Sequence, residues 1–244
     1  MEFIHSGLAA LAEVVRASIG LIFMAPLVAL LAFGGEFVQH AWEVSAGMFA
    51  SKAAFVALQT SPDRLAFGMI KATALIVAVF WSARLLAAHE ASASGDLLGP
   101  IDWRPLLLSA ALTAIPLALV FFAPWPSREL RLAALAGAAL IGLPFSRMGR
   151  DALFGAARQP LSGLMRGRPR PPMAELVTIL PVAGLMVLHF INHDFAFAAP
   201  PPVLWLLMVW DSLVVAWLAL ILGVATRRYS RPKRIDPSMP LPIR

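Results

Sequence analysis

Residues 203–226 read VLWLLMVWDSLVVAWLALILGVAT, an apolar run with a single charged residue, Asp211. A helix needs about 20 predominantly apolar residues to cross the hydrocarbon core of a bilayer, and this run is long enough. The run therefore predicts a transmembrane helix that carries a carboxylate. Because a charged side chain inside a membrane is costly, Asp211 is the first candidate functional residue.

The composition of the whole chain also indicates a membrane protein. Of its 244 residues, 59% are hydrophobic and 14% are charged, whereas roughly a quarter of an ordinary soluble domain is charged. Further apolar runs predict an all-α fold, a polytopic integral membrane protein with about six transmembrane helices. The predicted spans are 17–35, 65–83, 105–124, 132–146, 176–192 and 203–226.

These spans are expected to form one membrane domain over residues 1–230, followed by a basic, proline-rich, disordered cytoplasmic tail over 231–244. Pro26, Pro116 and Pro181 each lie in an odd-numbered span that a return span follows, which favours three helical hairpins. The first span is long for a signal peptide and lacks a clear cleavage site, so we expect a retained anchor.

The Lys and Arg residues predict the orientation, because cytoplasmic loops of membrane proteins carry an excess of them. With both termini in the cytoplasm, the outer loops hold only Lys52, Arg64, Arg128 and Arg131, and nearly all the other basic residues lie inside. We therefore predict a multi-pass protein of the bacterial inner (plasma) membrane.

The inner loops also suggest what the chain contacts. The Arg-rich segment 150–170 is expected to lie on the lipid bilayer and to attract its anionic lipids. These arginines are not accompanied by aromatic platforms or by a nucleic-acid-binding motif, so no nucleic-acid partner is expected.

The first outer loop, residues 36–64, is amphipathic at its start. Glu36, Gln39, His40 and Glu43 are spaced at i, i+3, i+4 and i+7, which places them on one face if the segment is helical. The spacing predicts a helix at the outer interface or dipping into the protein, with one polar stripe.

Lys71 and Asp211 are charged residues inside predicted spans. Both lie roughly 10–12 Å below the outer interface, given a helical rise of 1.5 Å per residue. Opposite charges at matching depth predict an ion pair between Lys71 and Asp211, direct or through water.

His189 and His193 lie one helical turn apart near the outer end of the fifth span, with Asp194 beside them. One interpretation is a metal site for zinc, iron or manganese, completed by His40 and a carboxylate of the first outer loop. A second is a proton or solute path. The pattern lacks the glutamate of the HExxH motif. We therefore expect these residues to be the water-exposed outer end of a membrane helix, with no bound metal and no cofactor.

By this topology the outer half of the bundle predicts a polar cavity open to the outside. Its residues are Glu36, His40, Glu43, Lys71, His189, His193, Asp194 and Asp211. A small transporter or channel-like permease is the function we expect. The alternative is a non-catalytic subunit or assembly factor, with partner membrane subunits or further copies of the chain. A metal-dependent membrane enzyme comes third, because the sequence has no G-x-S-x-G, phosphate-binding loop or CxxC motif.

Overall fold

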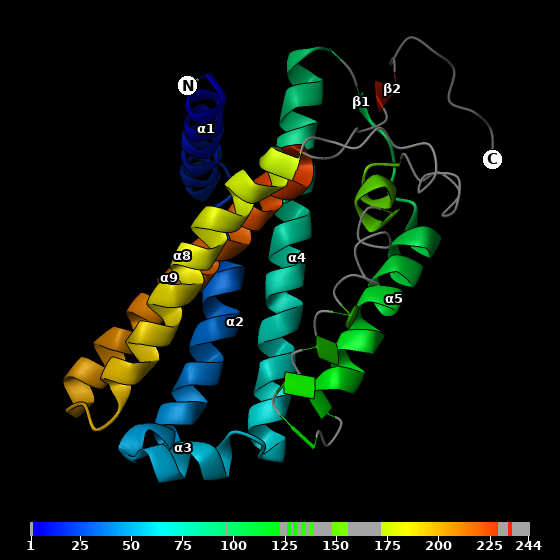
Figure 1. Cartoon of the computed structure of the whole chain (residues 1–244). Helices are drawn as coiled ribbons and strands as arrows, with labels where there is room; N and C mark the ends of the chain where they lie inside the picture. Colours follow the sequence, from blue (N-terminus) through cyan, green and yellow to red (C-terminus); the bar gives the residue numbers. More distant parts are fainter. Residues whose placement is uncertain are drawn as a thin grey trace. The chain divides into compact units, whose positions relative to one another are not determined.

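The computed structural model describes part of the chain in detail: residues 2–95, 97–122, 126–127, 129–130, 133–134, 137–138, 148–155, 172–228 and 234–235. Helices make up nearly all of this part (Figure 1), in agreement with the predicted all-α class. The chain divides into two compact units. One comprises Met1–Leu85 with Arg170–Thr226, and the other comprises Leu86–Pro169 with Arg227–Arg244.

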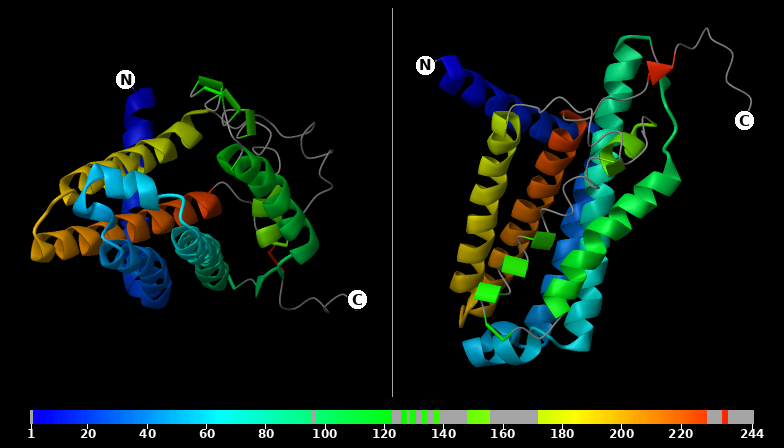
Figure 2. Two further views of the ribbon diagram at one scale, coloured as in Figure 1. Left: turned by 90° about the horizontal axis from the view of Figure 1, so that it is seen from below. Right: turned by 45° about the vertical axis from the view of Figure 1, so that its right-hand side comes forward.

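The first unit combines the N-terminal third of the chain with a later segment, Arg170–Thr226. Its elements are α1 (Glu2–Met24), α2 (Pro26–Ser45), η1 (Met48–Ala50), α3 (Lys52–Leu58), most of α4 (Pro62–Ala93), α8 (Pro172–Ala196) and α9 (Pro201–Arg228). Helices α8 and α9 run antiparallel, side by side, and α2 lies next to them (Figures 1 and 2). The short α3 connects the end of α2 to the start of α4.

A sharp bend interrupts the first predicted span. The stretch Leu11–Met24 makes an angle of 97° with Pro26–Ser45. Between them, Ala25 has φ −140° and ψ 60°, well away from helical values. Proline suits the first position of the new helix, because the N–H that it lacks would have no partner there. The predicted span 17–35 is therefore not one straight helix.

Fewer membrane-length helices are found among the described residues than the six spans predicted. Among the described residues, α4 and α9 are long and apolar enough to cross a membrane, and the bent α1–α2 pair makes a third candidate if it counts as one span. The predicted spans 105–124 and 176–192 fall largely on helices α5 (Trp103–Phe122) and α8. Span 132–146 falls mostly outside the described residues. Six spans are not confirmed.

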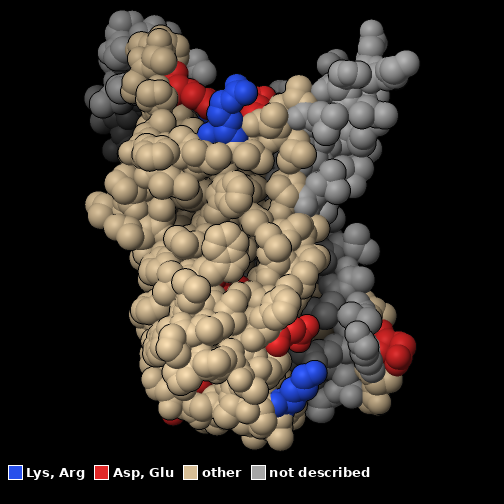
Figure 3. Space-filling model, turned by 90° about the vertical axis from the view of Figure 1, so that its left-hand side faces the viewer, with Lys and Arg blue, Asp and Glu red and all other residues tan. Residues whose placement is uncertain are grey.

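The surface of the first unit resembles that of a membrane protein. Figure 3 shows a broad uncharged band, with charged side chains gathered toward the two ends of that face. Large apolar side chains of several helices are exposed, including Leu27 of α2, Phe190 of α8 and Leu206 of α9. Such contiguous apolar surface is expected where a protein meets lipid.

Two glycines let α4 pack closely against its neighbours in the first unit. A Cβ atom added to Gly35 of α2 would lie 2.6 Å from Cβ of Ala74, and one added to Gly223 of α9 would lie 2.5 Å from Cβ of Ser82. Small residues at such contacts are typical of membrane helices, since they let backbones approach. The close approach at Gly35 places α4 beside the next residue of α2, Glu36.

The second unit holds α5, the end of α4, a helical segment at 148–153, and strands β1 (Leu97–Leu98) and β2 (Arg234–Ile235). The strands pair antiparallel. Apart from β2, the predicted tail falls outside the described residues.

Candidate functional site

Four polar residues of α2 point into the first unit. Glu36, His40 and Glu43 are fully buried, and Gln39 is 5% exposed. The helix runs through these positions to Ser45, so the predicted polar stripe is helical. Because the stripe faces inward, its polar groups must find hydrogen-bond partners inside the protein.

His40 lies at the centre of this group. Its Nδ1 is 2.9 Å from Oε2 of Glu43, and its Nε2 is 2.8 Å from Oδ2 of Asp211. Nε2 is also 3.2 Å from Oε1 of Glu36. An ionised carboxylate only accepts hydrogen bonds. Both ring nitrogens of His40 therefore carry a proton, or one neighbouring carboxyl group carries the second proton.

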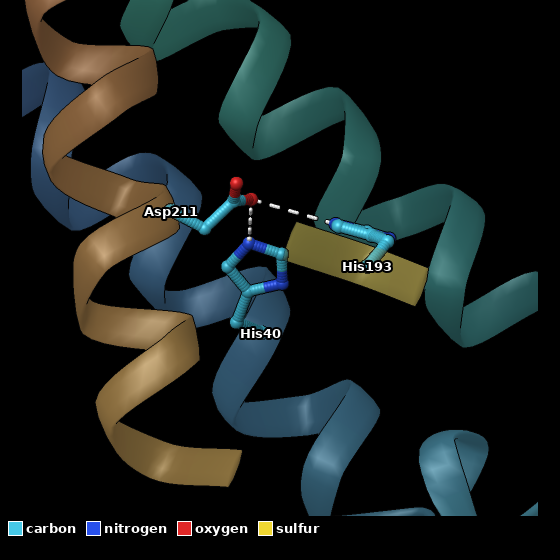
Figure 4. Close-up of side chains that lie close together, drawn as sticks. All are labelled: His40, His193 and Asp211. Carbon is cyan, nitrogen blue, oxygen red and sulfur yellow. Dashed lines mark hydrogen bonds and ion pairs between the residues drawn. The ribbon is translucent and has the colours of Figure 1, made fainter. Parts of the chain in front are cut away.

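Three imidazole rings lie around one carboxylate oxygen of Asp211 in α9. Its Oδ2 lies 2.8 Å from His40 Nε2, 2.7 Å from His189 Nδ1 and 3.4 Å from His193 Nε2. Helix α8 continues past His193, so the two α8 histidines share one face, with ring centroids 4.6 Å apart. Figure 4 shows His40 and His193 converging on Asp211. The three histidines of the predicted site thus meet at one carboxylate.

Lys71 pairs with Glu36 instead of Asp211. Its Nζ donates to Oε1 of Glu36 at 2.7 Å. The predicted direct pair of Lys71 with Asp211 is wrong, because Glu36 and His40 lie between the two. The reason is the close approach of α4 to α2 at Gly35, which brings the Lys71 side chain to the neighbouring Glu36.

A second cation of α4, Arg64, forms an ion pair with Glu43. Its Nε donates to Oε1 of Glu43 at 2.9 Å, and Nε2 of Gln39 donates to the same oxygen at 2.6 Å. The predicted site included neither Arg64 nor Gln39. The sequence does contain features that indicate both residues. Arg64 lies two helical turns before Lys71, on the same helical face, and Gln39 belongs to the polar stripe.

The formal charges of the cluster do not cancel when the histidines are neutral. Three fully buried carboxylates (Glu36, Glu43, Asp211) face two cations, Lys71 and Arg64, whose side chains are 23% and 24% exposed. One negative charge is left over. An uncompensated buried charge is strongly destabilising, so the cluster holds an extra proton or takes up another cation.

Several polar atoms at the cluster have no hydrogen-bond partner within the described part of the chain. They are Oε2 of Glu36, Oδ1 of Asp211 and Nε2 of His193. Buried polar groups are nearly always hydrogen-bonded, and each exception requires an explanation. Two sets of side chains here place donor atoms within 4.8 Å of one another, as metal binding requires: His40 with His193 and Asp211, and Glu36 with His189 and Asp211.

Of the predicted site residues, Asp194 does not join this cluster, because it lies on the exposed side of α8. The other seven meet within the first unit. Access to them from outside the membrane stays a prediction.

Comparison with protein-family models, curated proteins and solved structures gives no match. The fold and site define a class, a helical protein whose described residues include two or three membrane-length helices and a buried cluster of acids, bases and histidines.

Proposed function

We propose that this chain is a small membrane transporter, a permease that passes a cation through the buried cluster between α2, α8 and α9. The observation that carries the proposal is the set of ionisable side chains enclosed between these helices, with Glu36, His40 and Asp211 fully buried. Ionisable residues inside membrane helices are rare and commonly mark ion or substrate paths.

The bend between α1 and α2 supports transport. Discontinuous helices form the binding sites of many secondary transporters, where the free helix ends and the unwound backbone contact substrate and ions. Here α2, which follows the 97° break, carries four of the cluster's residues.

The burial of the cluster also favours transport over the alternative, a subunit of a larger complex. A subunit whose polar face packs against a partner would present that face at its surface. Here Asp211 is fully enclosed by helices of the same chain and surrounded by His40, His189 and His193. The cluster needs no second protein to cover it.

The proposal includes a location in the bacterial inner (plasma) membrane, with both termini in the cytoplasm. The distribution of Lys and Arg supports this orientation. It places α3, the end of α2 and the start of α4 outside, and the cluster in the outer half of the membrane.

Reconstitution into proteoliposomes tests the proposal. Entry of protons and of divalent cations would be followed with dyes trapped inside, for the unmodified chain, for His193→Ala and for Asp211→Asn. We expect cation entry above that of protein-free vesicles, and its loss in both variants. Asp194→Asn, which changes an exposed carboxylate on the same helix as His193, is the matched control. No flux above protein-free vesicles, or equal flux in His193→Ala and Asp194→Asn, would contradict transport.

A further inference from the structure

We infer that His40, His189, His193 and Asp211, joined by Glu36, bind one divalent transition-metal ion. The inference deepens the proposed function by naming the class of cation, and in that sense it rests on it. Binding can nevertheless be measured without transport.

The positions of the donor atoms support a metal site. In a tetrahedral zinc site with bonds of about 2.0–2.1 Å, neighbouring donor atoms lie about 3.3 Å apart. Oδ2 of Asp211 lies 2.8 Å from Nε2 of His40 and 3.4 Å from Nε2 of His193. Both distances are close to that spacing, and the donor atoms of His40, His193 and Asp211 all lie within 4.8 Å of one another, as do those of Glu36, His189 and Asp211.

A second, independent observation is the set of unpartnered atoms. Glu36 and Asp211 are fully buried, and each keeps one carboxylate oxygen without a hydrogen bond among the described residues. Nε2 of His193 also lacks a hydrogen bond, although it faces Oδ2 of Asp211. A bound cation would satisfy these lone pairs, which ion pairing within the cluster leaves unused.

Glu43 completes the arrangement behind His40. Histidines that bind metals usually donate their other ring N–H to a carboxylate, which fixes the tautomer and orients the ring. Nδ1 of His40 lies 2.9 Å from Glu43, and Glu43 is itself held by Arg64 and Gln39. This leaves Nε2 of His40 directed at Asp211. Any second proton on His40 would leave as the ion binds.

The donor types select among metals. Imidazole nitrogen with carboxylate oxygen suits zinc and its first-row neighbours, whereas calcium and magnesium prefer oxygen alone. The chain contains no cysteine, so no thiolate is available for copper(I). Zn²⁺, with Co²⁺ as its spectroscopic substitute, is therefore the appropriate probe.

The test uses the full chain, purified in detergent with an affinity tag that lacks histidine and then stripped with a chelator. Zn²⁺ would be titrated by calorimetry and Co²⁺ by visible absorption. We expect saturation at one ion per chain and the visible bands of four- or five-coordinate Co²⁺, with no saturable binding of Mg²⁺ or Ca²⁺.

Two variants and one control make the result specific. His193→Ala removes a ligand without breaking a hydrogen bond, so it should fold and lose Zn²⁺ binding. Glu43→Gln weakens the support of His40 and should lower affinity about 10- to 100-fold. His89→Ala removes an exposed imidazole of α4 and should bind as the unmodified chain does.

Absence of saturable Zn²⁺ binding to the folded chain, or equal affinity in His193→Ala and His89→Ala, would overturn the inference. The two proposals can fail independently. Zinc binding without cation flux would support the metal site and contradict transport. Proton flux without zinc binding would support transport and contradict the metal site.

Discussion

Nε2 of His40 lies 2.8 Å from Oδ2 of Asp211, although the two residues are 171 positions apart in the sequence. Both side chains are fully buried. The contact ties α2 to α9, and His189 at 2.7 Å from the same oxygen adds α8. Three helices are therefore held in register by one carboxylate.

Asp211→Asn should destabilise the protein strongly. The substitution keeps the shape of the side chain but removes the charge that faces three histidines. Breaking a buried ion pair by changing one partner costs about 3–5 kcal/mol. Unfolding in detergent, followed by heat or denaturant, would measure the loss. Asp194→Asn, on the exposed side of α8, should stay within about 0.5 kcal/mol of the unmodified chain. Equal stability of the two variants would mean that Asp211 does not hold the cluster together.

A double-mutant cycle should couple Lys71 to Glu36. Lys71→Met leaves Glu36 without its 2.7 Å partner, and Glu36→Gln leaves Lys71 without an anion. The double variant should recover part of the loss, with a coupling energy of about 0.5–3 kcal/mol. The same cycle for Lys71 and Asp211 should show a smaller coupling. If Lys71 couples more strongly to Asp211 than to Glu36, the pair of Lys71 with Asp211 that their equal depth predicts would be correct after all.

Adjacent glycines of α2 should respond differently to substitution. Gly35→Ala would place a methyl group 2.6 Å from Cβ of Ala74, whereas a methyl group at Gly34 meets nothing within 4 Å. We expect Gly35→Ala to cost about 1–3 kcal/mol through overpacking. Gly34→Ala should be neutral or stabilise α2 by up to about 1 kcal/mol, because alanine is the better helix former. Thermal unfolding of the two variants side by side measures this, and equal melting temperatures would contradict the close contact of α2 with α4.

The proposed orientation predicts the accessibility of two exposed alanines. The chain has no cysteine, so Ala53→Cys in α3 and Ala93→Cys at the end of α4 each introduce a single thiol. In intact cells an impermeant maleimide should label position 53 and not position 93. The reverse pattern would place the cluster on the cytoplasmic side.

Much of the local structure of the site could be predicted from the sequence. The spacing of Glu36, His40 and Glu43 indicates one helical face, and His189 with His193 indicates another. Asp211 is conspicuous as the only charge in a long apolar run. Each of these inferences needs only the 3.6-residue period of a helix or the cost of burying a charge.

The pairing of helices could not be predicted in the same way. Depth in a membrane places Lys71 and Asp211 at one level but does not say how each helix is rotated, and the contact of α4 with α2 at Gly35 decides that Lys71 meets Glu36. Pro26 likewise signals a break, yet its angle depends on what α1 packs against. Hydropathy alone does not establish the number of spans either, because it treats a bent pair of helices as one run.

X-ray absorption of the zinc-loaded protein tests the central claim most directly, because it reports the atoms around the ion. If His40, His189, His193 and Asp211 converge on one cation, the zinc edge should show nitrogen and oxygen ligands at about 2.0–2.1 Å together with the outer scattering of imidazole rings. His193→Ala should lower the imidazole contribution, and His89→Ala should leave it unchanged. A spectrum of oxygen ligands alone, or one that His193→Ala leaves unaltered, would contradict a cation site between α2, α8 and α9.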